Sequence, residues 1–403
     1  AGRLDAGTPV APWGVAMFDT SFSPLWPIFS HDGSKIYFFG RLFGLPGMGL
    51  YELDTAGGTA RLIMWDSLDK ADPKLSPDGK KILFVARSFG DVYEFDLTTK
   101  KYQALTHHYY HGGYARALYL SNGDILLSGP KDFPGDDWKK ARFDLSELWV
   151  LSRKLDKPPT RLGEICWEGP AVSRTQLRIA WAQHRDAAYG QGAFYHLKVA
   201  DLDYSSGEPR LVNARVVLDN QREAIKGQVL EPQNFRPGRE DELTVQAYPN
   251  CEVHVLNCKT GELVNYSTDP KSYDEPEGIF PDGDYTLVES SRHNNSNSGG
   301  SIDLWKLKLE VGNPAWERIT WFNAAGKFKA SNPVVSDDGR YIAFQVAGVR
   351  EVAGIIIGGQ SDDWIYGGND SDDIIGGHNV AAGHDADDRH LPRHPVRPRR
   401  HRL

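Results

Sequence analysis

A short turn phrase recurs along the chain, each time just before a run of β-forming residues. The clearest copies are Ser76-Pro77-Asp78-Gly79, Phe280-Pro281-Asp282-Gly283 and Ser336-Asp337-Asp338-Gly339, with related copies at 30–33, 121–123 and 173–176. Asp-Gly and Asn-Gly between β-runs mark tight hairpins, because glycine adopts a positive φ without a Cβ clash. Recurrence every 40 to 50 residues or so predicts stacked units, and a four-stranded propeller blade has about that period.

The blades can be counted from the β-run that follows each hairpin. Such runs occupy 50–54, 91–96, 147–151, 196–201, 252–256 and 302–307. With the fifth inner hairpin at Asn234–Ala247, the pattern predicts six full blades and the first half of a seventh at Ala330–Ala347. The stretch Val15–Phe18 is expected to supply an outer strand and close the ring, which removes an exposed sheet edge. The sequence therefore predicts an all-β fold, a seven-bladed β-propeller of four-stranded antiparallel blades over residues 1–350.

Composition limits the partners of such a chain. The net charge is −8, which weighs against a nucleic-acid partner. No apolar run approaches the length of a membrane span. The chain begins at Ala1 rather than Met, so we expect that a leader has been removed.

After residue 350 the composition changes to Gly and Asp. Two nine-residue units, 358–366 and 367–375, carry paired glycines, paired aspartates and an Ile at the eighth position. The segment 351–383 resembles the RTX nonapeptide repeat, which winds a β-roll around Ca²⁺ outside the cell. This resemblance implies Ca²⁺ ligands at Asp362, Asp363, Asp372 and Asp373. The pattern departs at position four, where Ser361 and Asp370 replace Gly, and a flexible linker is the alternative.

The last segment, 384–403, is rich in Arg, His and Pro. It has no apolar periodicity and cannot bury a core, so we expect a basic disordered tail.

Propeller topology brings two sets of residues to one end of the ring, opposite the Asp-Gly hairpins. One set follows the second strand of each blade: Arg41, Arg87, His184, Arg185, Tyr248, Arg292 and His293. The other stands where the inner strand starts: Trp26, Asp72, Arg116, Glu168, Asn234, Glu277 and Asn332. Arginines gathered in an acidic protein indicate a binding site, because loops from every blade converge there. Surface or inter-blade ion pairs are the alternative for each of them.

Two segments at this end carry dense polar clusters. The loop 107–114 contains His107, Tyr109, Tyr110 and His111, which could serve as acid and base or hold Zn²⁺ or Mn²⁺. The alternative is an aromatic loop that plugs the ring. The segment 273–278 has three carboxylates, which could neutralise the arginines, grip a cation or form a solvated acidic turn.

The phrase Ser76–Ala86 looks like the TolB-type β-propeller repeat, and Ser336–Phe344 is similar. The resemblance covers roughly residues 23–347. It implies the fold, and it is shared by periplasmic TolB, by the propeller caps of prolyl oligopeptidases and by polysaccharide lyases of the oligogalacturonate and ulvan type. A secreted or periplasmic protein is the expectation that follows.

Two functions remain open at this stage. The first is a lyase that cleaves an acidic polysaccharide or oligosaccharide by β-elimination. That reaction needs a cation to neutralise the uronate carboxylate, a base for the C5 proton and an acid for the leaving oxygen. The expected neutraliser is Arg116 or Arg185, and the expected acid–base groups are His107, His111, His184 and Tyr248. The expected contacts to substrate are Arg41, Arg87, Tyr109, Tyr110, Glu168, Arg185, Asn234, Glu277, Arg292 and His293. The second function is a non-catalytic TolB-like propeller that binds a glycan or a protein partner.

Overall fold

The computed structural model describes residues 22–42, 46–57, 59–86, 90–107, 114, 116–130, 146–184, 194–296, 299–325 and 328–348. Within these ranges the regular secondary structure is almost entirely β-strand, as predicted. The described helices are 3-10 turns such as η3 (Glu223–Ile225), η4 (Gly299–Ser301) and η5 (Phe322–Ala325), and none could span a membrane. The predicted strand at 15–18, the repeats at 351–383 and the tail at 384–403 lie outside the described residues.

The strands form seven antiparallel sheets in sequence order. The first two sheets contain β1 (Phe22–Phe29), β2 (Lys35–Leu42), β3 (Gly49–Asp54), β4 (Arg61–Trp65), and β5 (Lys70–Leu75), β6 (Lys81–Ala86), β7 (Val92–Asp96), β8 (Lys101–Ala104). The next two contain β9 (Arg116–Tyr119), β10 (Ile125–Pro130), β11 (Ser146–Leu151), β12 (Thr160–Ile165), and β13 (Trp167–Val172), β14 (Arg178–His184), β15 (Tyr195–Asp203), β16 (Arg210–Asp219). The last three contain β17 (Val229–Arg236), β18 (Arg239–Tyr248), β19 (Glu252–Asn257), β20 (Leu263–Asn265), then β21 (Asp274–Ile279), β22 (Tyr285–Ser290), β23 (Asp303–Lys308), β24 (Trp316–Arg318), and β25 (Phe328–Val335) with β26 (Ile342–Gly348).

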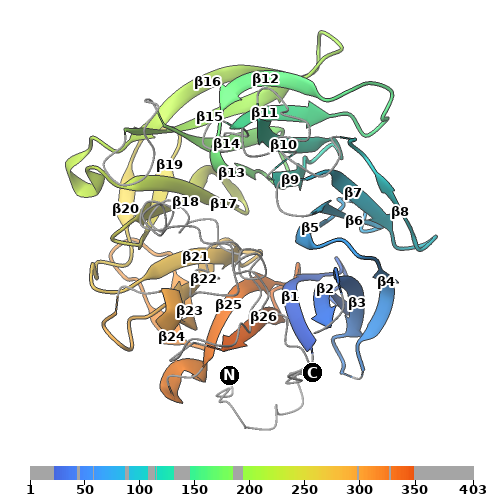
Figure 1. Cartoon of the computed structure of the whole chain (residues 1–403). Coiled ribbons are helices and arrows are strands. Elements are labelled where there is room, and N and C mark those ends of the chain that lie inside the picture. The colour runs from blue at the N-terminus through green and yellow to red at the C-terminus, as the bar shows by residue number, and fades with distance from the viewer. Residues whose placement is uncertain are drawn as a thin grey trace, which may run out of the picture.

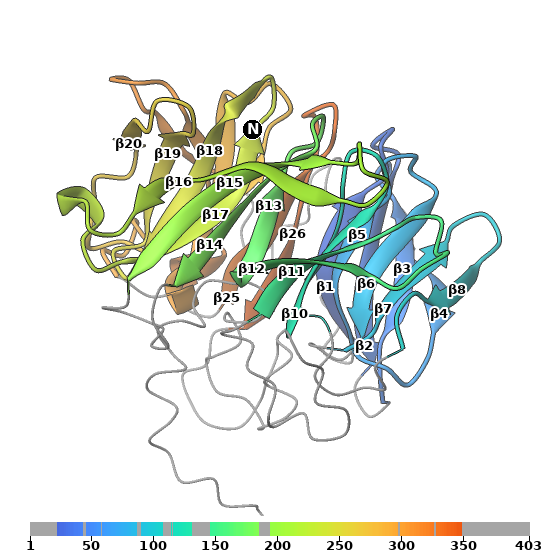
Figure 2. The ribbon, with the colours of Figure 1, turned by 90° about the horizontal axis from the view of Figure 1, so that it is seen from above.

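These sheets are the blades of a propeller arranged around one axis (Figure 1). The first strand of each blade is innermost, and it contacts the first strand of the next blade from β1 round to β25. Strands β25 and β26 in turn contact β1, so the ring closes. From the side, neighbouring blades stand next to one another with their strands crossing the thickness of the ring (Figure 2).

The expectation of seven four-stranded blades is wrong in number. Among the described residues six sheets have four strands, and the sheet β25–β26 has two. The two-stranded sheet ends at Gly348, the last described residue, so the fold is a propeller with six complete blades. The fifth inner hairpin is also longer than the expected Asn234–Ala247. It runs from Val229 to Tyr248 and turns at Pro237-Gly238, a pair that lacks the Asp-Gly signal.

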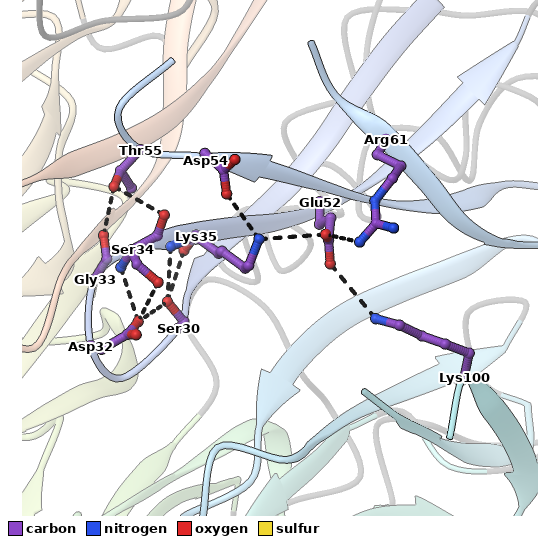
Figure 3. A network of polar contacts seen from close by, with 10 residues as sticks. All are labelled: Ser30, Asp32, Gly33, Ser34, Lys35, Glu52, Asp54, Thr55, Arg61 and Lys100. Carbon is purple, nitrogen blue, oxygen red and sulfur yellow. Dashed lines mark hydrogen bonds and ion pairs between the residues drawn. The ribbon is translucent and has the colours of Figure 1, made fainter. Parts of the chain in front are cut away.

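The recurrent turn phrase has a common physical cause. In the first blade the Asp32 carboxylate accepts bonds from the Ser30 hydroxyl at 2.6 Å and the Ser34 amide at 3.0 Å (Figure 3). The Ser30 hydroxyl oxygen accepts from the Lys35 amide at 2.9 Å, so it pins the start of the second strand. The same serine-to-aspartate bond recurs in two other blades, at Ser76–Asp78 and Ser336–Asp338. Gly33 completes the turn with a φ of +67°. The phrase is a folding signal.

Apolar side chains fill the spaces between blades. The Phe39 ring of the first blade meets Phe84 of the second edge-on, with centroids 5.5 Å apart. Trp181 on β14 and Tyr195 on β15 of the fourth blade are both fully buried. Burial of such rings is the main stabilising term of a repeat fold, because each blade covers the apolar face of its neighbour.

The seam between the last and first blades carries specific polar contacts. The Trp26 amide lies 3.5 Å from Oε1 of Gln345, and the Phe29 and Tyr341 rings pack 6.5 Å apart. At the hairpin end, Nδ1 of His31 lies 2.6 Å from Asp337, and its Nε2 lies 2.9 Å from the Ser76 carbonyl. Arg174 of the fourth blade donates to the same Asp337 at 3.2 Å. His31 therefore joins the first, second and last blades.

The His31 contact gives the seam a pH dependence. The bond to Asp337 raises the pKa of His31 above its usual 6.5. Because the folded pKa is raised, the contribution is complete below the unfolded value and is lost as pH rises through the folded value. We expect His31→Gln to lower the unfolding free energy by about 0.5–1 kcal/mol near pH 5.5 and by less near pH 8.5, since the pair is half-exposed. Denaturant unfolding at the two pH values measures this. Arg210→Gln, which removes an outer ion pair with Asp203, is the control and should show no such trend; an equal effect of His31→Gln at both pH values would contradict the assignment.

Candidate axial site

The inner strands break their register at a similar place in several blades. The breaks fall between Leu25 and Ile28 in β1, between Ala71 and Lys74 in β5, and between Ser331 and Val334 in β25. Each break contains a residue with positive φ followed by proline: Trp26-Pro27, Asp72-Pro73 and Asn332-Pro333. Such bulges redirect side chains, and here they occur on the strands that surround the axis. We call the polar residues of the inner strands around these breaks, together with their partners on the neighbouring strands, the axial site.

One side of the axial site is formed by the second and third blades. Arg116 begins β9, and its guanidinium lies 3.8 Å from the Asp72 carboxylate on β5. Lys74, two residues along β5, pairs with the same Asp72. The Arg116 and Asp72 side chains are 14% and 11% exposed, whereas Lys74 is 37% exposed. Two cations thus share the Asp72 carboxylate.

The other side is formed by carboxylates of the sixth blade. Glu275 on β21 stands directly opposite Glu289 on β22, and both are buried. The Tyr273 hydroxyl donates to Glu275, and the Asn332 amide donates to Glu289 at 2.5 Å. The segment 273–278 is therefore a buried inner strand, and the expectation of a solvated acidic turn does not hold.

Glu277 differs from the other two glutamates of this wall. It lies in the register break of β21, where the Asn234 side chain donates to its backbone carbonyl at 2.6 Å. The residue is half-buried, and its Oε1 atom is enclosed with no hydrogen-bond partner among the described residues. Burial and then the charges of Glu275 and Glu289 raise the pKa of Glu277 well above its usual value. The positive charges of Lys74 and Arg116 act in the opposite direction and lower this pKa.

The fifth blade supplies amides beside this wall. Gln246 stands opposite Glu231 in the β17–β18 ladder, and it is 1% exposed. Its Nε2 and Oε1, and Nε2 of Gln233, have no hydrogen-bond partner among the described residues. Unpartnered buried polar atoms are costly, and in native proteins they gather where water, an ion or a ligand completes them.

Several residues expected at this end are engaged elsewhere. Arg41 donates to Asp69 at 3.1 Å. Arg292 pairs with Asp274 at 3.0 Å and lies 3.3 Å above the Trp316 ring, and His293 stacks on Trp305. His184 is buried beside the Tyr195 ring. For Arg41, Arg116 and Arg292 the structure thus shows ion pairs, the alternative that the sequence left open.

For the other expected residues the structure gives only the position in the fold, or they lie outside the described residues. Tyr248 ends β18 and packs against a cluster of Cys251, Tyr273 and Ile302, so it lies near Glu275. His107 is exposed at the edge of its loop, and Glu168 lies within β13. The remainder lie outside the described residues: Arg87, Tyr109, Tyr110, His111, Arg185, and the tail positions Asp362, Asp363, Asp372 and Asp373.

The structure thus brings Arg116, Asn234 and Glu277 to one site, and it adds partners that the sequence did not single out. The added residues are Lys74 and Glu289, which lie beside Tyr273 and Glu275 of the segment 273–278 that the sequence had marked. The recurring residue-proline pair in the inner strand is the sequence signal that could have located the site, because it marks the register break in three blades.

The described residues do not fit a Zn²⁺ or Mn²⁺ centre. No three of their His, Cys, Asp and Glu side chains are arranged to hold a metal ion. The Glu275 and Glu289 carboxylates are instead held by the Tyr273 hydroxyl and the Asn332 amide.

Comparison with known proteins identifies the fold. No protein-family model and no curated sequence matches the chain. An oligogalacturonate lyase in complex with manganese has a TM-score of 0.55 at 15% identity, over 82% of this chain and 91% of its own. The hydrazine synthase of Kuenenia stuttgartiensis has a TM-score of 0.55 at 12% identity, over 85% and 99%. TolB from Acinetobacter baumannii, at 14% identity over 80% and 65%, scores 0.40, too low to carry an argument. The chain has the β-propeller fold that proteins of unrelated chemistry share.

The buried Glu289 carboxyl provides a test of the acidic wall. Burial raises the pKa of Glu289 to about 7, above the usual 4.5. Between these values the folded state holds a proton that the unfolded state has lost, so stability falls as pH rises. We expect Glu289→Gln to remove a pH-dependent loss on the order of 2–3 kcal/mol across this window. Denaturant unfolding at a series of pH values measures it, with exposed Glu310→Gln as the control. Parallel pH profiles for wild type and Glu289→Gln would contradict the assignment.

Proposed function

We propose that this propeller binds a uronic-acid polysaccharide or oligosaccharide at the axial site and cleaves it by β-elimination. The observation that supports this most directly is the division of charge across the axis. Lys74 and Arg116 stand on one side, and Glu277 stands on the other. An acidic sugar needs a cation for its carboxylate and a base for its C5 proton, and these two sides supply both kinds of group.

Arg116 is the group proposed to neutralise the uronate. Its guanidinium lies 3.8 Å from Asp72 on the inner strand β5, and Asp72 also pairs with Lys74. A guanidinium matches a carboxylate with parallel hydrogen bonds, which hold it as negative charge develops beside it. Lys74 is more exposed, and it would contact the incoming chain.

Tyr248 is the group proposed to protonate the leaving oxygen. It lies at the end of β18, at the same end of the ring as the start of β21, and it packs beside Tyr273. A phenol is a suitable donor to a glycosidic oxygen. The fold likeness to oligogalacturonate lyase adds support at the level of architecture. A polysaccharide substrate and the TolB-type repeat together point to a secreted or periplasmic location.

The proposal is tested by incubating the protein with a panel of uronic-acid polysaccharides and following the ultraviolet absorbance of the unsaturated product. Arg116→Ala should lower kcat/KM by ~10²–10³-fold, because it removes stabilisation of the developing charge. Arg116→Lys should recover part of the loss, which separates the charge from a folding defect. Arg210→Ala on the outer strand β16 is the control and should match wild type.

The outcomes are distinct. A wild-type protein that yields no unsaturated product from any uronate contradicts the lyase assignment. Retained binding in that case, weakened by Arg116→Ala, identifies a non-catalytic propeller that binds a glycan. Cleavage that is unaffected by Arg116→Ala contradicts the site.

A further inference from the structure

The three glutamates of the sixth blade are not equivalent in their hydrogen bonding. Glu275 accepts from the Tyr273 hydroxyl, and Glu289 accepts from the Asn332 amide at 2.5 Å. Each donor fixes the position of one carboxylate. Glu277 has no such donor, and its Oε1 is enclosed without a partner among the described residues. Of the three glutamates, Glu277 is therefore the one whose carboxylate oxygen could accept a proton from a substrate.

The backbone holds Glu277 in place independently of its side chain. The residue lies in the register break between Pro276 and Ile279, where the β21–β22 ladder is interrupted. Asn234 of the neighbouring blade donates its side-chain amide to the Glu277 carbonyl at 2.6 Å. A bulge next to an active site commonly serves to aim one side chain, and this contact anchors the bulge between two blades.

We propose that Glu277 is the general base of the axial site and takes the C5 proton of a uronate whose carboxylate rests on Arg116. This inference rests on the proposed function for its substrate. In the step, the C5–H bond breaks and its proton passes to the Glu277 carboxylate. The bonding electrons form the C4=C5 double bond, the C4–O bond breaks, and the leaving oxygen takes the phenol proton of Tyr248.

The electrostatic surroundings suit this role. Glu275 and Glu289 are the like charges that face Glu277, and Lys74 and Arg116 are the opposing cations. Burial and the like charges make the Glu277 carboxylate a stronger base than a free one, because they favour its protonated form. Glu275 and Glu289 act through Glu277 and are positioning residues.

Only the ionised form of Glu277 can accept the C5 proton, so the pH profile of cleavage follows the ionisation of this residue. Cleavage rises with pH as Glu277 loses its proton. Glu289→Gln removes one like charge, lowers the pKa of Glu277 and moves the rising limb of log kcat against pH to lower pH. A purely structural role for Glu289 would lower activity without moving that limb. Glu310→Gln, an exposed carboxylate paired with Lys308, is the matched control and should leave the limb in place.

The first experiment needs no substrate. Infrared difference spectra between wild type and Glu277→Gln, recorded over a series of pH values, should contain one carboxylate band that grows as pH rises, with a midpoint above that of the exposed Glu310 measured from Glu310→Gln. A Glu277 carboxyl that stays protonated up to the alkaline limit of the folded protein cannot accept a proton, and that result overturns the inference. This reading holds whether or not uronates are cleaved, so it separates failure of the base from failure of the proposed function.

The second experiment uses a uronate oligosaccharide. Glu277→Gln should lower kcat by ~10²–10⁴-fold, the range for loss of a general base, while binding of the oligosaccharide changes less than threefold or so. The circular dichroism spectrum and unfolding midpoint of Glu277→Gln test whether the ring still closes. A folded Glu277→Gln protein that keeps its kcat overturns the inference, even if Arg116→Ala confirms that the axial site binds the sugar.

Discussion

The structure depends on the closure of the ring by contacts between β25–β26 and β1. Six blades pair four strands each, but the last sheet pairs only two among the described residues. The seam is held by the packing of Phe29 on Tyr341 and by the bonds of Trp26 and His31 to residues of the last blade. If the seam opened, the inner strands would no longer face one axis, and Arg116 and Glu277 would lose their relation across it. Closure therefore underlies both stability and the proposed chemistry.

The axial site is a place where the fold departs from the most stable arrangement. Buried carboxylates carry a desolvation penalty, and those of the sixth blade are only partly compensated by Tyr273 and Asn332. Elsewhere in the same blade compensation is fuller, since Arg292 pairs with Asp274 and also stacks on Trp316. Local departures from good pairing are expected at functional sites, because preorganised charge is what such sites use. The contrast within one blade points to the glutamates rather than to Arg292 and His293.

The sequence predicted the all-β propeller, the inner hairpins and the positions of most third strands. These predictions succeeded because the turn phrase has a local cause. The serine-to-aspartate bond and the glycine with positive φ both lie within four consecutive residues. The fifth hairpin was placed short because Pro237-Gly238 turns the chain without that phrase. The last sheet has two strands among the described residues, so the structure has six four-stranded blades rather than seven.

The site was harder to predict because its members come from separate blades. Topology placed Arg116, Asn234 and Glu277 on inner strands; Arg116 begins β9, whereas Asn234 and Glu277 lie further along β17 and β21 than expected. Topology did not show that Arg41 and Arg292 are engaged by Asp69 and Asp274, because those pairings depend on side-chain packing. Nor did it show that 273–278 is buried rather than solvated. The burial of a polar strand depends on the blades on either side of it, so it cannot be predicted from the residues of that strand alone.

The most direct measurement of the central claim is a crystal structure of the Glu277→Gln protein with a uronate oligosaccharide bound. The account predicts that the sugar lies across the axis at the end opposite the hairpins. Its carboxylate should contact Arg116, and its C5 should face residue 277. An oligosaccharide bound on the outer strands or at the hairpin end, with Arg116 still paired only to Asp72, would contradict it.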